Sequence, residues 1–365
     1  MRSATWIADQ RLANQRLTKP TLERAIDVVS LLGAVQAQDY GAAKWGLAQR
    51  MRDATDADIE KEIVAGTIVR THILRPTWHF VAAADIHWML ALSAPRVHAF
   101  NAYYYRTLEL DQAIFTKSTK ILIRALQGGK HLTRAELGSA LDKAGIPMKD
   151  SSRLNASMMR AELDGVVCSG PRRGKQFTYA LLEERVARTK VLERDEALAE
   201  LARRYFLTRG PATADDFSWW SGLTKSDSRR AAEAAAPDLE HEIIDGRPHW
   251  FPPPTRVTKR RTPLAHLLPN YDEYFIGLKD RSAFAARLRA ARIEARTDAL
   301  SGHVLAIDGQ IVGGWNRTLR GKEAVLHLKL LQRLTAPEKR AVDRAAGSFG
   351  EFLGIEARIQ GYKVP

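Results

Sequence analysis

Apolar residues recur at helical spacing in two stretches of the middle of the chain, about 80 residues apart. In the first stretch three helices are predicted between residues 118 and 163, and Gly145 and Pro147 end the second of them. Two strands joined by a basic turn follow at 166–180. Three helices and a hairpin are the order of a winged helix, so we predict one at residues 116–190.

The second stretch repeats this order. Helices are predicted from residue 195 to residue 236, and the hairpin after them turns at Asp245 and Gly246. Asp-Gly is among the strongest short signals for a two-residue hairpin turn. We therefore predict another winged helix at residues 191–256, and the repetition of one pattern supports the assignment of both copies.

The first part of the chain, residues 1–115, follows the same plan more loosely. Its predicted elements are a helix at 21–32, helical patches at 41–50 and 56–65, strands at 68–74 and 78–81, and a bridging helix at 85–110. We interpret this part as a first winged helix with bridging helices.

The pattern changes after the three prolines at 252–254. The predicted elements are strands at 304–307, 310–312 and 324–330, a helix at 336–352 and a last strand at 355–359. This predicts a C-terminal β-rich, barrel-like domain at residues 257–365. The fold class expected for the whole chain is α+β, with three tandem winged-helix domains followed by this C-terminal β-barrel-like domain.

Composition narrows the class of protein. Of the 365 residues, 45% are hydrophobic and 27% charged, as in a soluble globular protein, and we find no apolar run of bilayer length. The polar start lacks a secretory signal, so a cytoplasmic, nucleoid-associated protein is expected. Cys168, the single cysteine, excludes an internal disulfide. The net charge of +14 favours a polyanionic partner, either nucleic acid or an acidic membrane.

The placement of the basic residues favours DNA. They cluster on the first hairpin tip, on the third helix of the later copy and in the linker after it, which in winged helices are the elements that meet DNA. The predicted DNA-binding residues are Arg172, Arg173, Lys175, Lys225, Arg229, Arg230, Lys259, Arg260 and Arg261. Each cluster taken alone could equally be a solvated loop. A membrane partner would require a basic amphipathic helix, which is absent, so we expect none.

Several kinds of chemistry have no signal in the sequence. There is no Cys-x-x-Cys, His-Glu-x-x-His, Walker or Gly-x-Gly-x-x-Gly motif, so neither a metal nor a cofactor is expected. Trp78 and His79 are better explained by packing than by metal binding or base stacking. Asp272 and Glu273 could supply a general base for glycosidic chemistry, but capping or turn formation at a domain junction is the preferred interpretation.

Two carboxamides, Gln36 and Gln38, end the apolar stretch at 26–35, where helical periodicity would call for further core residues. They are expected between the first two helices of the chain, at a helix end or in the joining turn. Each carboxamide has two donors and an acceptor, so the pair could hold a polar substrate or a water. Alternatively both could simply tie the turn to backbone groups.

Three segments carry a family resemblance: residues 34–38 (AVQAQ), residues 75–79 (RPTWH) and residues 268–274 (LPNYDEY). With them the chain resembles, over nearly its whole length, the winged-helix DNA glycosylases of the AlkZ/YcaQ type. The resemblance implies three tandem winged helices and a β-barrel around a concave DNA-binding surface, and cleavage of N-glycosidic bonds of alkylated bases. It implies Gln36 and Gln38 as the catalytic pair, and Gln38 places the chain in the AlkZ branch, because the YcaQ branch has Gln-x-Asp.

The expected enzyme is a monofunctional DNA glycosylase that acts on N-alkylated purines in double-stranded DNA, with interstrand crosslinks as a further candidate substrate. A purine alkylated at a ring nitrogen is cationic and leaves readily, so a carboxamide that holds a water could suffice. No lysine is indicated as a nucleophile, which favours hydrolysis without strand cleavage. The alternative is a non-catalytic winged-helix regulator. It would require a dimer, whereas the chain has no dimer segment and suits a monomer.

Overall fold

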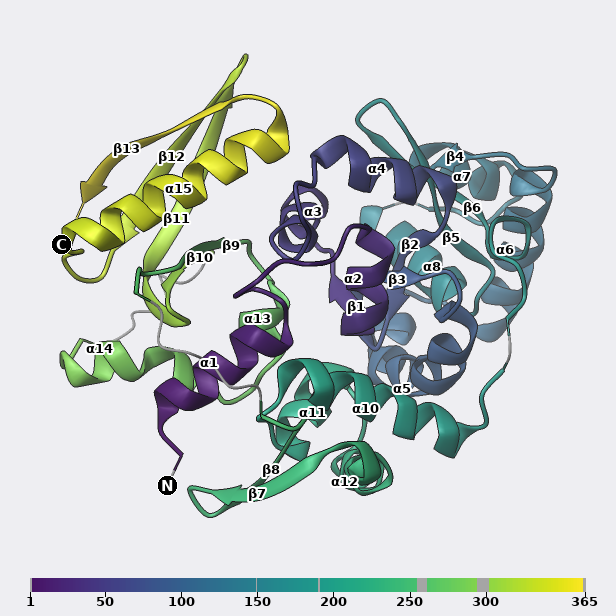
Figure 1. Cartoon of the computed structure of the whole chain (residues 1–365). Coiled ribbons are helices and arrows are strands. Elements are labelled where there is room, and N and C mark those ends of the chain that lie inside the picture. The colour runs from purple at the N-terminus through teal and green to yellow at the C-terminus, as the bar shows by residue number, and fades with distance from the viewer. Residues whose placement is uncertain (1, 149, 190, 255–260, 294–301, 364–365) are drawn as a thin grey trace.

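Four small sheets, each packed against helices, organise the chain (Figure 1). The computed structural model describes residues 2–148, 150–189, 191–254, 261–293 and 302–363. Within these ranges the sheets have the strand orders β1-β3-β2, β4-β6-β5, β7-β8 and β13-β12-β11-β10-β9. The chain is therefore mixed α and β, as predicted.

The first segment builds the three-stranded sheet that carries the two glutamines. Its elements are α1 (Ala4–Asn14), α2 (Ala25–Leu32), β1 (Ala34–Gln36), α3 (Tyr40–Ala48), α4 (Asp56–Ala65), β2 (Ile68–Ile73), β3 (Arg75–Ala82) and α5 (Ile86–Thr107). The helix predicted at 56–65 is confirmed as α4, and a capping box between Thr55 and Asp58 begins it.

The position of Gln36 differs from its expected place in a turn or helix end. Gly33, at a φ of 79°, ends α2, and the chain then enters the short strand β1, which pairs with β3 and includes Gln36. Three residues are too few to show the alternation that marks a strand. Strand β1 exists because β3 offers it an edge, which is a tertiary effect. Gln38 does lie in the bend before α3, as expected.

The two middle segments have the predicted order of elements. They are α6 (Gln112–Leu126), β4 (Leu132–Thr133), α7 (Arg134–Lys143), α8 (Ser151–Leu163), β5 (Val167–Arg173), β6 (Gln176–Leu181) and α9 (Leu182–Arg185), then α10 (Arg194–Arg209), α11 (Ala214–Ser221), α12 (Lys225–Ala234), the 3₁₀ turn η1 (Ala236–Asp238), β7 (Glu240–Ile244) and β8 (Arg247–Phe251). Capping boxes begin α7 at Thr133 and α11 at Thr213. The boundaries of the proposed domains stay a prediction.

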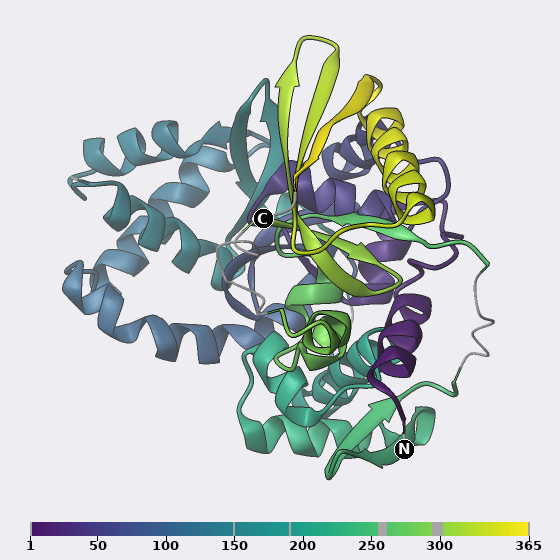
Figure 2. The same ribbon diagram turned by 90° about the vertical axis from the view of Figure 1, so that its left-hand side faces the viewer.

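The C-terminal segment forms an open sheet. Its elements are β9 (Ala265–Leu268), α13 (Glu273–Ile276), η2 (Ser282–Ala285), α14 (Ala286–Ala290), β10 (His303–Ile307), β11 (Gln310–Arg320), β12 (Glu323–Leu330), α15 (Ala336–Leu353) and β13 (Glu356–Lys363). The segment is β-rich as predicted, but the sheet does not close into a barrel, because β9 and β13 are its two edges and do not pair. Helix α15 instead crosses over so that β13 returns parallel to β12, and Figure 2 shows α15 alongside the sheet.

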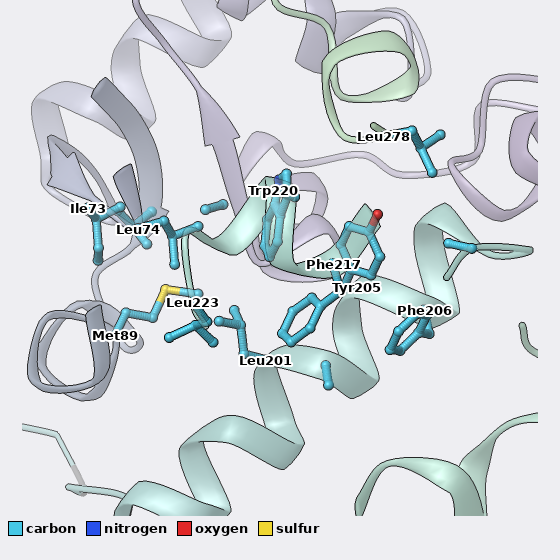
Figure 3. Close-up of a cluster of buried hydrophobic side chains, with 14 of the residues drawn as sticks. Ile73, Leu74, Met89, Leu201, Tyr205, Phe206, Phe217, Trp220, Leu223 and Leu278 are labelled. Atoms are coloured by element: carbon cyan, nitrogen blue, oxygen red, sulfur yellow. The ribbon is translucent and has the colours of Figure 1, made fainter. Parts of the chain in front are cut away.

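A buried cluster joins the first sheet to the α10–α12 segment. Tyr205 and Phe206 of α10 pack with Phe217 and Trp220 of α11, to the side of the tight β2–β3 turn at Leu74 (Figure 3). Trp220 is fully buried in this cluster, whereas its neighbour Trp219 is 43% exposed. Because this cluster is continuous with the first sheet, α11 is held directly beside the strand of Gln36.

Candidate active site

Gln36 belongs to a row of polar side chains across the first sheet. In the antiparallel register it lies opposite His79 of β3, and His79 lies opposite Thr71 of β2. Directly opposed residues project from the same face of a sheet with their Cβ atoms about 5 Å apart. Gln36, His79 and Thr71 therefore share one face, which is turned inward, and all three are buried.

Both the backbone and the side chain of Gln36 are held. Its backbone N–H donates to Oε1 of Glu273 at 2.8 Å. Its side-chain Oε1 accepts from Nη2 of Arg75 at 2.9 Å, and the residue is only 5% exposed. Burial lowers the pKa of Arg75, an effect that Glu273 counteracts. One amide of the motif is thus fixed in orientation, and its Nε2 remains as a donor.

Glu273 is the anchor of this strand. Its Oε2 accepts from Nη2 of Arg209 at 2.6 Å and from Nε1 of Trp220 at 2.9 Å, and its side chain is almost fully buried. Arg209 also donates to the carbonyl oxygens of Leu32 at 3.0 Å and of Ala34 at 3.3 Å. The end of α2, strand β1, α10 and α11 are therefore tied together through one carboxylate.

Asp272, the neighbour of Glu273, makes a second buried ion pair. Its two oxygens accept from Nη2 and Nη1 of Arg50 at 2.9 and 3.0 Å, and it caps α13 by accepting from the backbone N–H of Tyr274. The preferred interpretation of Asp272 as a capping residue is confirmed. Both carboxylates are saturated by arginine donors, which leaves neither of them free as a general base.

The inward face beneath Gln36 holds polar atoms without partners. Burial, followed by the charge of Arg75, lowers the pKa of His79 to about 3, so its ring is neutral. Its Nδ1 lies 2.9 Å from the carbonyl oxygen of Thr77, which places the ring proton on Nδ1. Nε2 of His79 and Oγ1 of Thr71 and of Thr77 have no hydrogen-bond partner within the described ranges.

Gln38 lies in a different environment. It is exposed, and its Oε1 makes a long contact of 3.4 Å with the backbone N–H of Trp78. It lines a cleft of about 660 Å³ together with residues of α3, β6 and β11, among them Lys175, Phe177 and Arg317. Figure 1 shows the hairpins β5–β6 and β11–β12 projecting toward the same end of the molecule, with α3 and α4 between them.

One wall of this cleft is a network of ion pairs. Nζ of Lys44, which is buried, lies 2.8 Å from a carboxylate oxygen of Asp56 and 2.7 Å from one of Glu60. Glu60 is shared with Nε of Arg172 at 3.1 Å. Lys175, in the β5–β6 turn, and Arg317 of β11 have no ion-pair partner in the described part of the chain, so free positive charge lies on both of these walls of the cleft.

Most of the chain matches a known protein family. The family model described as DNA glycosylase AlkZ-like matches residues 29–352. The chain belongs to the AlkZ-like DNA glycosylase family. A curated relative, the interstrand DNA cross-link repair glycosylase of Streptomyces sahachiroi, is 26% identical over 324 residues, which cover 84% of this chain and 85% of the relative.

The fold of this AlkZ-like chain agrees with that of a solved family member. The structure of Streptomyces sahachiroi DNA glycosylase AlkZ superposes with a TM-score of 0.77 at 24% identity and covers 98% of this chain and all of the other. At that identity the likeness shows the fold. The predicted DNA-repair glycosylase function is confirmed by the family, which does not favour the regulator.

The AlkZ-like structure brings together only part of the predicted DNA-binding set. Arg172 and Lys175 line the cleft beside Gln38. Arg173, on the same hairpin, is turned away into an ion pair with Glu136 at 2.8 Å and donates to the carbonyl oxygen of His131. The three hairpin residues therefore differ in how free their charges are.

The other predicted DNA-binding residues lie elsewhere. Lys225, Arg229 and Arg230 are exposed on α12, at the lower edge of Figure 1, whereas β5 and β6 lie in its upper part. Arg230 pairs with Asp195 at 3.1 Å. Arg261 is exposed. Lys259 and Arg260 lie outside the described residues.

Sequence reasoning missed three arginines of this site: Arg70 in β2, Arg75 in β3 and Arg317 in β11. Arg75 was inside a recognised motif, but its bond to Gln36 depends on how β1 pairs with β3. Arg70 did carry a signal, because it is a charged residue in a strand of six buried positions. In the described ranges no cluster of His, Cys, Asp and Glu could hold a metal, and none of the helices is long and apolar enough to cross a bilayer.

Proposed function

We propose that this glycosylase hydrolyses the N-glycosidic bond of N-alkylated purines in double-stranded DNA, with Gln36 and Gln38 as its catalytic pair. The observation that carries the proposal is the arrangement of the two amides. One is fixed by Arg75 and by the Glu273 anchor, and the other lines a cationic cleft large enough for a nucleotide. Fixed dipoles beside a charged groove suit a reaction that develops positive charge on the sugar.

The proposed division of labour follows from which atoms are free. Gln38 Oε1 has only a long contact to Trp78, so it can accept from an attacking water and face the oxocarbenium ion. Gln36 Oε1 is held by Arg75, which leaves its Nε2 to donate to the sugar or phosphate. A cationic base needs little acid catalysis, which agrees with the saturation of Asp272 and Glu273.

Hydrolysis without strand cleavage is part of the proposal. Strand cleavage by a glycosylase requires an amine that attacks the sugar. Of the two lysines that line the cleft, Lys44 is engaged through Nζ by Asp56 and Glu60, and we assign the ammonium of Lys175, on the hairpin and unpaired within the described residues, to a phosphate contact rather than to attack on the sugar. The relative's name adds interstrand crosslinks to the proposed substrates, since a crosslink through purine nitrogens has the same cationic leaving base. We also propose a monomer, with winged helices at 1–115, 116–190 and 191–256.

The test measures release of 7-methylguanine from a methylated duplex by the wild type, Gln36→Ala, Gln38→Ala and the double variant. Removing a preorganised dipole of this kind costs about 10² to 10³-fold in rate. We expect such a loss for Gln38→Ala at unchanged stability, because the residue is exposed. Gln36→Ala should in addition lower the free energy of unfolding by about 1 to 2 kcal/mol, since Arg75 loses its acceptor.

Gln127→Ala, an exposed glutamine at the end of α6, is the matched control and should behave as wild type. DNA affinity of the double variant should be largely retained. Equal release by the wild type and the double variant, or no release by the wild type, would contradict the catalytic proposal. A borohydride-trapped complex or nicked strands would contradict hydrolysis without cleavage.

A further inference from the structure

Arg70 differs from the three other buried arginines of the described chain, Arg11, Arg50 and Arg209. Arg11 has no ion pair among the described residues, but its Nε and Nη2 both donate to the carbonyl oxygen of Pro211. Arg50 and Arg209, at 1% and 0% exposure, are neutralised by Asp272 and Glu273. Arg70, at 7% exposure, forms no ion pair within the described ranges. A buried charge without a counter-ion is costly, so the absence of a carboxylate at this position calls for an explanation.

Aromatic rings surround the Arg70 guanidinium. Its Cζ lies 4.3 Å from the ring centroid of Trp78, 4.8 Å from that of Phe177 and 6.0 Å from that of Tyr40. Such cation–π contacts compensate part of the lost hydration, but they use the face of the guanidinium and leave its edge free. Burial lowers the pKa of Arg70, and Glu162 opposes this effect.

The hydrogen-bonding edge of Arg70 is half used. Nε donates to the carbonyl oxygen of Ala37 at 3.0 Å, which fixes the guanidinium to the residue between the two glutamines. Neither Nη atom donates to another residue of the described chain, and neither is enclosed, so both reach solvent. Glu162 is occupied by His72 and by Nε1 of Trp78 at 3.4 Å.

Arg70 is connected to the cleft of Gln38 through its neighbours, although it is not itself one of the residues that line that cleft. Two of the rings that surround it, those of Tyr40 and Phe177, line that cleft, and Phe177 is 41% exposed. A planar guanidinium with two free Nη groups is suited to bind a phosphate, and weak hydration makes it more suitable than an ammonium in a semi-buried place.

We propose that Arg70 binds one backbone phosphate of the damaged strand and thereby sets the lesion's sugar in register with Gln38. This inference rests on the proposed DNA glycosylase function and adds a substrate-positioning residue to it. Because Nε holds Ala37 while the Nη atoms hold the phosphate, one rigid group fixes the distance between the catalytic loop and the DNA backbone. In the complex, the phosphate of the substrate then serves as the counter-ion that Arg70 lacks within the described part of the protein.

The experiment couples one protein residue to one phosphate. Wild type, Arg70→Gln and Arg70→Lys are titrated with duplexes containing 7-methylguanine, in which the phosphates flanking the lesion are replaced one at a time by neutral methylphosphonates. Arg134→Gln is the matched control, because Arg134 lies over the same Trp78 ring at 5.6 Å but is bonded to Asn155 and Tyr179. Unfolding curves establish that each variant is folded.

We expect one replacement to weaken wild-type binding about tenfold, the scale of a charge-assisted contact. Arg70→Gln should bind the unmodified duplex about tenfold more weakly than the wild type, with a salt slope smaller by about 0.9. Replacing the same phosphate by a methylphosphonate should then cause this variant no further loss of affinity. Arg70→Lys should keep the salt slope of the wild type and part of the coupling between residue 70 and the phosphate. This variant serves as the test if Arg70→Gln fails to fold. Base release by both variants should fall with affinity at low DNA concentration.

Equal penalties for every methylphosphonate in the wild type and the Arg70 variants would overturn the inference, and a base stacked on Arg70 would give this result. The same coupling in Arg134→Gln as in the wild type is the expected control result. If the wild type shows the coupling but releases no base, the catalytic proposal fails and the phosphate site stands. If it releases base without the coupling, the phosphate site alone fails.

Discussion

The two ends of the Gln36-Ala37-Gln38 segment are held in opposite ways. At Gln36 the strand is buried, and a chain of charged groups from α10, α11 and α13 fixes both its backbone and its side chain. At Gln38 the side chain is exposed in a cleft lined by Lys175 and Arg317, neither of which has an ion-pair partner in the described ranges. Two residues apart, the chain passes from an inner environment held by buried ion pairs to an outer one that is open to a ligand.

This contrast shows how a precise polar site can exist in a small strand. An exposed loop alone would not hold a carboxamide in one orientation, since a mobile dipole must be reorganised during the reaction. Here the inner end supplies rigidity through buried ion pairs, and the outer end supplies access. Substitutions at the inner end should therefore mainly lower the free energy of unfolding. Substitutions at the outer end should mainly weaken DNA binding and slow base release.

The largest effect is expected when the anchor of the inner end is broken. Glu273→Gln leaves Arg209 buried without its counter-ion, and its amide cannot accept from Gln36, Arg209 and Trp220 together. Removing one partner of a buried ion pair costs about 3 to 5 kcal/mol. Urea unfolding should show this loss, and base release should fall even at temperatures where the variant is folded, because β1 loses its hold.

Asp272→Asn is the matched control for the anchor. It breaks the neighbouring buried pair with Arg50 and should destabilise the protein to a similar extent, but Asp272 does not contact Gln36. Base release by the folded fraction should therefore be close to wild type. If both variants lose base release in proportion to stability alone, the anchor has no specific effect on the motif.

A smaller effect concerns the histidine beneath Gln36. The pKa of His79 is about 3 in the folded protein and near 6.5 when the chain is unfolded. Between these values the unfolded chain binds more protons, so stability is lost as the pH falls below about 6.5. The loss at pH 5 should be about 2 kcal/mol relative to pH 7, as measured by urea unfolding.

His79→Gln should not show this loss of unfolding free energy between pH 7 and pH 5, whatever its stability at neutral pH. The control His327→Gln changes an exposed histidine of β12 and should keep the wild-type pH dependence. Identical pH dependence in wild type and His79→Gln would mean that His79 is not buried in its neutral form.

The outer end of the segment was more predictable from sequence than the inner end. Lys175 and Arg172 followed from a basic hairpin tip, and Gln38 from its place in the family motif at residues 34–38. Such features are local in the chain, so periodicity and turn signals suffice to place them. The order of helices and hairpins was predictable for the same reason.

The inner end could not be predicted because it is made of distant contacts. Glu273 is 237 positions away from Gln36, and the strand that carries Gln36 forms only because β3 offers an edge. Whether the barrel-like C-terminal sheet closes could not be predicted for a similar reason, since strand count alone does not show whether the edge strands meet. Arg70 had a sequence signal, but its lack of a carboxylate partner is visible only in the fold.

The smallest expected effect concerns the β5–β6 hairpin beside Gln38, where it distinguishes a free positive charge from one held in an ion pair. Lys175→Gln removes an exposed ammonium that has no ion-pair partner within the described ranges, so the salt slope of duplex binding should fall by about 0.9. Affinity at moderate salt should fall by less than about tenfold, as for one phosphate contact. Arg173→Gln should change the slope less, because Arg173 must first leave Glu136 to meet a phosphate. A larger loss for Arg173→Gln than for Lys175→Gln, in titrations over a range of salt concentrations, would show that DNA breaks this ion pair and approaches the hairpin from its other side.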